Sequence, residues 1–237
     1  MNIMMNQKHY SIAVDGPSGA GKSSLSKKIS AAYHFVYLDT GAIYRTVGLA
    51  AGRAGIDRHS EQELAAILPG LKIEIRYDET GLQRMFLNGE DVSEAIRMPE
   101  ISLYASDVSA LPVCRAYLLD MQRRFAREYN VILDGRDIGT VVLPDADLKI
   151  YLTASSTARA QRRLKELLEK GVETTFEEVL KDIELRDYQD TTREIAPLRQ
   201  AEDAVLVDTS ELDFEQSFEA LCKVIEEKLP VRREAEA

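Results

Sequence analysis

The sequence predicts an α/β fold in which a doubly wound, five-stranded parallel sheet carries helices on both faces. Short apolar runs rich in Val, Ile, Leu and Tyr alternate with amphipathic stretches, a pattern typical of strands buried on both faces. Several runs end in aspartate, so acidic side chains should lie at the carboxyl edge of the sheet, where open α/β folds bind ligands. The predicted strands are 10–15, 35–39, 131–134, 148–152 and 204–208.

An inserted subdomain should interrupt this alternation. Residues 71–93 show period-two patterning with a Thr-Gly and an Asn-Gly turn signal, which predicts a small antiparallel β-meander. The helix before it should begin at a capping box formed by Ser60 and Glu63. Two helices near 98–110 and 112–129 should follow it, the second with a proline in its first turn.

Two more helices are predicted after the fourth strand. The first begins at a serine cap and ends at Gly171, the usual left-handed stop. The second is predicted over 174–198, with Thr174 and Glu177 as a capping box and Pro197 as its break. We expect one domain, with a core (about 10–58, 111–156 and 196–228), an insert (about 60–110), a helical lid (about 157–195) and a flexible tail (230–237).

The bulk composition argues against several classes of protein. A net charge of −10 disfavours a general nucleic-acid binder, which would need a broad basic surface. Two cysteines, Cys114 and Cys222, lie far apart without metal-ligand spacing, which favours a reducing compartment. The sequence has no signal-peptide core and no run of about 18 apolar residues. We therefore expect a cytoplasmic monomer with no membrane or nucleic-acid partner.

The loop after the first strand matches the phosphate-binding pattern GxxxxGK[ST]. Its backbone N–H groups should point at phosphate oxygens, and the following helix should direct its positive dipole end at the same place. Lys22 should reach the β and γ phosphates, and Ser23 should offer its hydroxyl to Mg²⁺. The motif indicates a P-loop NTPase. The sequence lacks the NKxD motif that reads guanine, which argues against a GTPase and leaves a kinase or a nucleotide-binding switch. The predicted ATP-binding residues are Gly16, Pro17, Ser18, Gly19, Ala20, Gly21, Lys22, Ser23 and Ser24.

Two sets of arginines recur at helical spacing. They are Arg159, Arg162 and Arg163 in the first predicted helix, and Arg186 and Arg193 with Asp190 in the second. Each set shares one helix face, so two adjoining helices could present guanidinium groups to one cleft. Planar arginine grips phosphate bidentately. The alternative is a surface ladder of salt bridges with the nearby glutamates.

A second anion site is predicted after the second strand. Thr40 and Gly41 should open a helix that carries Arg45 in its first turns, and a helix N-terminus with an arginine suits an anion. Arg45 could instead form a structural ion pair. An acceptor that is already an ionised phosphate needs no general base, whereas an alcohol would want a positioned carboxylate. The residues therefore fit a nucleoside monophosphate acceptor better than a sugar or shikimate alcohol.

Five segments together resemble the bacterial cytidylate (CMP) kinases. They are "DGPSGAGKSS", "LDTGAIYR", "DGRDIGT", "ASSTARAQRR" and "RDYQDTTREIAPL", in this order and spacing. The likeness runs from about residue 10 to 228, and the second and third segments are its most specific part. The resemblance implies transfer of the ATP γ-phosphate to CMP or dCMP, with Mg²⁺ as cofactor.

The resemblance also implies roles for individual residues. It places four residues around the acceptor phosphate: Thr40, Tyr44, Arg45 and Arg136. Ser106, Arg115 and Asp137 would face the cytosine, and Asp190 would meet the ribose. Arg186 and Arg193 would point toward the phosphates, and Arg159 and Arg162 would belong to a mobile lid. Asp134 would lie near Mg²⁺, in contact with it or through water. The expected catalytic residues are Lys22, Arg136, Arg159, Arg162 and Arg186. Thr40 and the Ser23-Ser24 pair depart from some members but keep a hydroxyl.

The choice of base has a physical explanation at Asp137. Cytosine offers an exocyclic N4 donor where uracil offers an O4 acceptor, so a carboxylate accepts from the first and repels the second. Asp137 is therefore expected to reject UMP. Two alternatives stay open: another small P-loop kinase, such as one that accepts both UMP and CMP, and a non-catalytic ATP-binding module.

Overall fold

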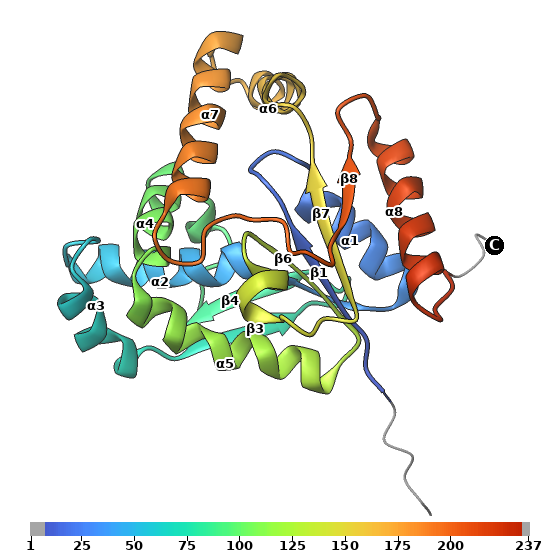
Figure 1. The fold of residues 1–237 in the computed structure, drawn as a ribbon. Helices are drawn as coiled ribbons and strands as arrows, with labels where there is room; N and C mark the ends of the chain where they lie inside the picture. The colour runs from blue at the N-terminus through green and yellow to red at the C-terminus, as the bar shows by residue number, and fades with distance from the viewer. Residues whose placement is uncertain (1–7, 234–237) are drawn as a thin grey trace, which may run out of the picture.

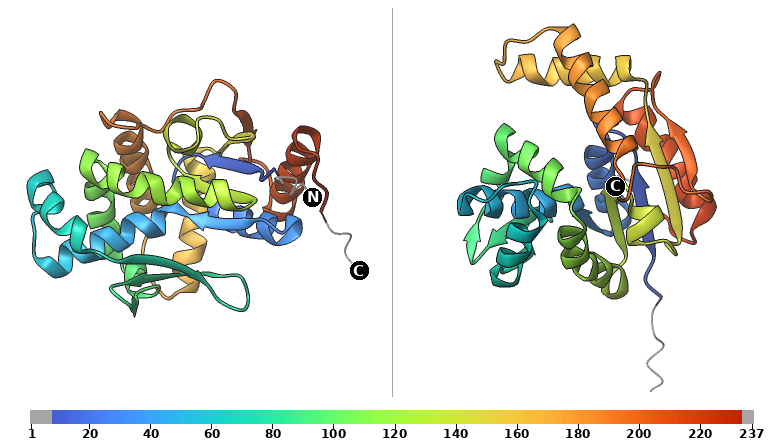
Figure 2. Two further views of the ribbon diagram at one scale, coloured as in Figure 1. Left: turned by 90° about the horizontal axis from the view of Figure 1, so that it is seen from below. Right: turned by 60° about the vertical axis from the view of Figure 1, so that its left-hand side comes forward.

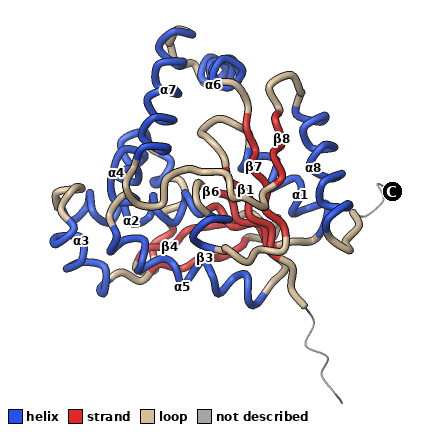
Figure 3. Tube along the Cα trace, viewed as in Figure 1, coloured by secondary structure: helices blue, strands red, loops and turns tan. Residues whose placement is uncertain are grey.

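Five parallel strands form the central sheet, as the sequence predicts (Figure 1, Figure 3). The computed structural model describes residues 8–233, and its strands lie in the order β2-β6-β1-β7-β8. Their bounds are β1 Ser11–Asp15, β2 Val36–Asp39, β6 Val131–Gly135, β7 Leu148–Thr153 and β8 Val205–Asp208. Because the strands are parallel, the loops that follow β1, β2 and β6 meet at one edge of the sheet.

Alternate residues of each strand face opposite sides of the sheet. In β1, Ile12 and Val14 pack into a cluster with α1 and α8, whereas Ala13 packs into a second cluster with α2 and α5. Both sides are therefore buried, which explains the nearly continuous apolar runs. Figure 2 shows these helices on the two sides of the sheet. Their bounds are α1 Lys22–Tyr33, α2 Thr40–Ala54, α5 Pro112–Glu128 and α8 Phe214–Lys228.

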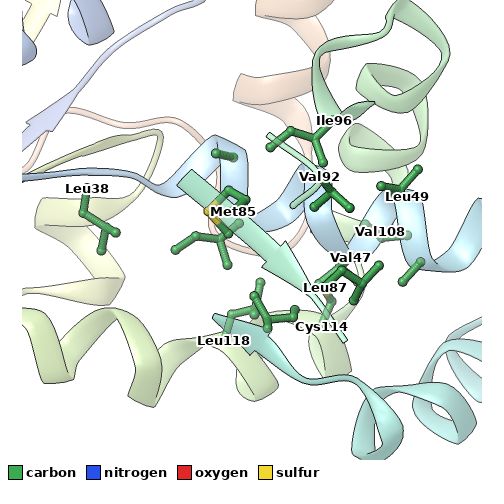
Figure 4. Close-up of a cluster of buried hydrophobic side chains, with 14 of the residues drawn as sticks. Leu38, Val47, Leu49, Met85, Leu87, Val92, Ile96, Val108, Cys114 and Leu118 are labelled. Atoms are coloured by element: carbon green, nitrogen blue, oxygen red, sulfur yellow. The ribbon is translucent and has the colours of Figure 1, made fainter. Parts of the chain in front are cut away.

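The predicted antiparallel insert is present and packs on the α2 side. Its strands are β3 Ile73–Tyr77, β4 Gln83–Leu87 and β5 Glu90–Asp91, in the order β3-β4-β5. At the turn between β4 and β5, Asn88 and Gly89 have φ values of 53° and 88°, the left-handed conformation that an Asn-Gly hairpin needs. Met85 and Leu87 of β4 contribute to the same core as Val47 and Leu118 (Figure 4). The insert is thus anchored to the main sheet by shared apolar packing.

Helices flank the insert on both sides. They are α3 Glu61–Ile67 and the 3₁₀ turn Leu68–Gly70 before it, and the 3₁₀ turn Ala95–Arg97 and α4 Pro99–Ser109 after it. Ser60 caps α3 by accepting from the Glu63 N–H, but the Glu63 carboxylate accepts from the Asp57 N–H, so half of the predicted box is confirmed. The predicted helices near 98–110 and 112–129 correspond to α4 and α5.

Gly48 lets α2 and α4 cross at close range. A Cβ at this position would lie 2.8 Å from the Ala105 backbone nitrogen and 3.1 Å from Tyr104 Cβ. The backbone must shift to make room, so we expect Gly48→Ala to lower the free energy of unfolding by about 1–3 kcal/mol. Chemical denaturation would measure this, with Gly70→Ala as the control because a Cβ there meets nothing within 4 Å. Equal stabilities of the two variants would contradict the expectation.

The last two predicted helices form a pair above the carboxyl edge of the sheet (Figure 1, Figure 2). They are α6 Ser156–Glu169, capped by Ser155, and α7 Phe176–Thr192. The predicted capping box of α7 is wrong by one residue, because Thr175 and Glu178 form it instead of Thr174 and Glu177. The sequence repeats both residue types, so the S/T-x-x-E pattern fits either register.

The predicted extent of α7 to Pro197 is also wrong. The helix ends at Thr192, and Arg193 adopts an extended conformation with ψ of 140°. The following turn is fixed by a hydrogen bond from the Leu198 N–H to the Asp190 carbonyl at 2.7 Å. No helix within residues 8–233 is long and apolar enough to cross a membrane. Of the tail predicted at 230–237, positions 234–237 lie outside the described residues.

Candidate active site

A cleft of about 670 Å³ lies at the carboxyl edge of the sheet. It is lined by the loops after β1, β2 and β6 together with α4, α6, α7 and the start of α8. This is where open α/β sheets bind their ligands. Of the residues predicted for the site, those that line the cleft are Ser18, Gly19, Ala20, Gly21, Lys22, Ser23, Ser24, Thr40, Tyr44, Arg45, Ser106, Arg115, Asp134, Arg136, Asp137, Arg162, Arg186, Asp190 and Arg193. Gly16, Pro17 and Arg159 are not among the residues that line the cleft.

The phosphate loop is shaped by close backbone approach. A Cβ on Gly16 would lie 1.9 Å from the Leu152 carbonyl oxygen, so only glycine fits where the loop leaves β1. Lys22 is buried, and its ammonium donates to the carbonyls of Gly16 and Pro17, each at 2.7 Å. An ammonium has three donors, so one is left for a phosphate oxygen. The loop therefore holds Lys22 in place by its own backbone.

A hydroxyl and a carboxylate meet beside this loop. Ser23 Oγ donates to Asp134 Oδ2 at 2.7 Å, and the Tyr37 hydroxyl donates to Asp134 Oδ1 at 3.1 Å. Asp134 is 3% exposed, and this burial raises the pKa of its carboxyl above the usual value. A nearby cation would offset that cost. The two oxygen groups are of the kind that hold Mg²⁺, which is bound by one or two carboxylates together with phosphates and water.

The start of α2 forms the second anion site. Asp39 caps the helix by accepting from the Ala42 N–H at 2.9 Å, and its other oxygen accepts from Arg45 Nη2 at 3.1 Å. Arg45 thus forms the structural ion pair that the sequence left open. Its Nε is buried and has no hydrogen-bond partner within residues 8–233, and the Arg45 side chain lines the cleft. Thr40 donates to the Asp134 carbonyl at 2.7 Å and ties this helix start to β6.

Arg136 connects the two sides of the cleft. Its Nε donates to Asp190 Oδ2 at 2.5 Å, which joins the loop after β6 to α7. Burial and the positive charge of Arg136 both lower the pKa of Lys22. Burial and the positive charge of Arg136 also lower the pKa of Arg186 in α7. Such a concentration of cations is unfavourable by itself and suits a cleft that receives phosphate groups.

Asp137 lies at the centre of a buried ion-pair cluster. It is 4% exposed, its Oδ2 accepts from Arg115, and its Oδ1 lies 3.6 Å from Arg193 Nη2. Arg115 also donates to the Ser109 carbonyl at 3.1 Å and lies over the Tyr44 ring, 5.6 Å from its centroid. The cluster joins the insert, the loop after β6 and the end of α7.

Two arginines of α6, Arg159 and Arg162, are held by hydrogen bonds to protein groups, which their helical spacing did not predict. Arg159 is 4% exposed and donates to the Ser18 carbonyl at 2.9 Å and to both oxygens of Asp187 at 3.0 and 2.6 Å. Arg162 donates to the carbonyls of Thr209 and Leu212. Figure 1 shows α6 and α7 side by side above these loops. Arg163 forms an exposed salt bridge with Glu166, which agrees with the alternative of a surface ladder of salt bridges.

A family model for cytidylate kinases matches residues 12–227 of this chain. The chain belongs to the cytidylate kinase family. Cytidylate kinase of Thermosipho melanesiensis is 48% identical over 217 residues, which cover 92% of this chain and 97% of the relative. Cytidylate kinase of Caldicellulosiruptor bescii is 48% identical over 219 residues, covering 92% and 95% of the two chains. The chain is therefore an enzyme, a nucleoside monophosphate kinase.

The fold of this cytidylate kinase family member also resembles a solved structure of low identity. The crystal structure of an uncharacterized protein from Eubacterium ventriosum superposes with a TM-score of 0.52 at 11% identity. The match covers 92% of this chain and 99% of that one. At this identity the likeness concerns the fold alone.

Some residues that line the cleft of this cytidylate kinase family member, or that support its lining, were not predicted from the sequence. Asp39 could have been found, because it ends a predicted strand at the edge where ligands bind. Leu212 and Phe214 line the cleft at the start of α8, after the last strand, so the same rule pointed to them. Asp187 gave no signal, because its pairing with Arg159 depends on how α6 and α7 pack.

Proposed function

We propose that this protein transfers the γ-phosphoryl group of ATP to CMP or dCMP by direct in-line displacement, giving ADP and the diphosphate. One observation carries the proposal: the phosphate loop, the start of α2 and the ion-pair cluster of Asp137 line the same cleft. Lys22 marks the donor site and Arg45 the acceptor site, while Asp137 belongs to the cluster. The family relatives bear the name of this activity.

The chemistry requires charge neutralisation and alignment. A phosphoryl group in transfer carries negative charge on its equatorial oxygens, and positioned cations stabilise that charge. Lys22, Arg136 and Arg186 are the cations that would do so here, with Arg45 on the acceptor phosphate. The acceptor is itself an ionised phosphate, so no side chain needs to remove a proton from it. Ser106, Arg115 and Asp137 would face the cytosine, and Asp190 the ribose.

We infer that Mg²⁺ is the cofactor. The Ser23 hydroxyl would bind it and the Asp134 carboxylate would bind it directly or through water, and phosphate oxygens and water would be its other ligands. The ion would neutralise phosphate charge when bound. Ser23 and Asp134 already lie 2.7 Å apart, so little rearrangement is needed to present both oxygens to one cation.

We further propose a division of labour within the chain. The insert, about 60–110, would close around the monophosphate, and the helical pair, about 157–195, would act as a lid that excludes water. The ion pairs Arg136–Asp190 and Arg193–Asp137 would couple the helical pair to the core, and the hydrogen bond from Arg115 to the Ser109 carbonyl would couple the insert. Both cysteines are free and buried, which is compatible with a cytoplasmic location. We infer a monomer, and light scattering should give one chain per particle.

Asp187→Asn is expected to reduce kcat about tenfold, because small misplacements of catalytic groups are costly. Asp187 accepts two hydrogen bonds from buried Arg159 and lies next to Arg186 in α7. Removing its charge would loosen α7 from the phosphate loop. Steady-state kinetics would measure this, with Glu184→Gln as the control because Glu184 is an exposed carboxylate of the same helix. A variant as active as that control would contradict the tether.

A coupled ADP-release assay tests the proposed function. With ATP and Mg²⁺, we expect ADP release with CMP and dCMP and much slower release with UMP or AMP. Chelation of Mg²⁺ should abolish the activity. Comparable rates with UMP would favour a kinase for both pyrimidines. ATP hydrolysis that does not depend on any acceptor, or no turnover at all, would contradict the proposal.

A further inference from the structure

Asp15 is a buried carboxylate to which the proposed reaction assigns no role. It is the last residue of β1, directly before Gly16 of the phosphate loop, and it is 5% exposed. Its Oδ1 accepts from the Ile138 N–H and its Oδ2 from the Gly139 N–H, each at 2.7 Å. Both donors lie more than 120 residues away in sequence. A carboxylate that accepts two backbone hydrogen bonds is held in a defined orientation.

These two bonds fix the backbone immediately after the base-recognition residues. Ile138 follows Arg136 and Asp137 and begins the short π-helical segment Ile138–Val142. The first N–H groups of a helical segment have no partner within it, so a capping acceptor is needed. Asp137 gives no side-chain cap, and its carbonyl accepts from later residues of the segment. Asp15 supplies the missing acceptor from another strand.

The local packing leaves little freedom for this contact to change. A Cβ on Gly139 would lie 3.4 Å from Asp15 Oδ2 and 3.1 Å from Lys149 Cδ, so a side chain there would press on both groups. Burial raises the pKa of Asp15 to about 6, partly offset by the hydrogen bonds from Gly139 and Ile138. Keeping a carboxylate in such a place is unfavourable unless its hydrogen bonds serve the structure.

We propose that Asp15 is a positioning residue for acceptor recognition. It acts through the backbone of Ile138 and Gly139 to hold Arg136 and Asp137 at a fixed position relative to the phosphate loop. Asp15 also directly precedes Gly16. It therefore connects the start of the phosphate loop to the end of the loop that carries Arg136 and Asp137. The inference rests on the proposed CMP kinase activity. It predicts that base selectivity depends on a residue that does not line the cleft.

The test compares Asp15→Asn with Asp147→Asn. The first variant keeps the shape but turns an NH₂ group toward a backbone N–H, which breaks one of the two bonds. Asp147 is the matched control, because it accepts from the Ser11 N–H at 2.9 Å at the opposite end of β1. For Asp15→Asn we expect kcat/KM for CMP to fall about tenfold to a hundredfold, a lower CMP-to-UMP ratio of kcat/KM, and a smaller change in the KM for ATP. Asp147→Asn should keep the ratio of the unmodified protein.

A second variant, Gly139→Ala, tests the same contact if Asp15→Asn does not fold. Gly139→Ala keeps the Asp15 carboxylate but crowds its contact, and it should lower the same ratio. A lower CMP-to-UMP ratio in either variant, in folded protein by circular dichroism, supports the inference. An unchanged ratio in both variants, which includes equal losses for CMP and UMP, would overturn it. Failure of the unmodified protein to release ADP with CMP would instead refute the proposed function.

Discussion

Arg136→Ala is expected to lower kcat for CMP phosphorylation by about a thousandfold, because an arginine that stabilises a transferring phosphoryl group contributes about this much or more. Arg136 Nε is held by Asp190 at 2.5 Å, which orients the guanidinium within the cleft. Its charge acts on Lys22 at the donor site and on Arg186 in α7. Single-turnover kinetics at saturating ATP and CMP would separate this loss from weaker binding.

Two further variants sharpen the test of Arg136. Arg136→Lys keeps the charge but loses the planar, two-pronged geometry, so we expect it to recover only part of the activity. Arg53→Ala removes an exposed arginine that pairs with Glu90 and should leave kcat unchanged. If Arg136→Ala raised the KM for CMP without lowering kcat, Arg136 would bind the ground state only, and its catalytic role would be refuted.

The sheet and the phosphate loop were predictable because local patterns encode them. Each strand is a short apolar run, and Gly16 with Lys22 belongs to a contiguous motif that can be recognised from the sequence alone. The insert was predictable for the same reason, since the turn at Asn88 and Gly89 gives its own signal. These features need no knowledge of distant contacts.

The charge pairing within the cleft could not be predicted in this way. Helical spacing placed Arg159 and Arg162 on one face, but it could not show that one would be buried against the Ser18 carbonyl and Asp187. The end of α7 at Thr192 is followed by a turn that the Leu198 N–H and the Asp190 carbonyl close, for which the sequence contains no signal as strong as Pro197. Thr40 and Arg45 were predicted from a helix start after the second strand, whereas the other acceptor residues came from resemblance to a family; the structure adds which of them pair.

Asp137→Asn is expected to lower the CMP-to-UMP ratio of kcat/KM about tenfold to a hundredfold, the range of one well-placed base contact. The carboxylate can only accept, so it matches the N4 donor of cytosine and repels the O4 acceptor of uracil. An amide can accept or donate, so this variant should tolerate either base. The ratio is measured within one sample, so partial loss of folded protein does not change it.

The alternative role for Asp137 is to neutralise buried arginines. Stability measurements distinguish this role from base recognition. Its side chain is 6% exposed and pairs with Arg115 and Arg193, so Asp137→Ala should cost about 3–5 kcal/mol of unfolding free energy. Asp137→Asn keeps an acceptor oxygen and should cost less. Asp203→Asn, which removes an exposed partner of Lys149, is the control for both measurements. If Asp137→Asn were destabilised while its CMP-to-UMP ratio stayed unchanged, Asp137 would hold the arginines, and one of those arginines would have to read the base.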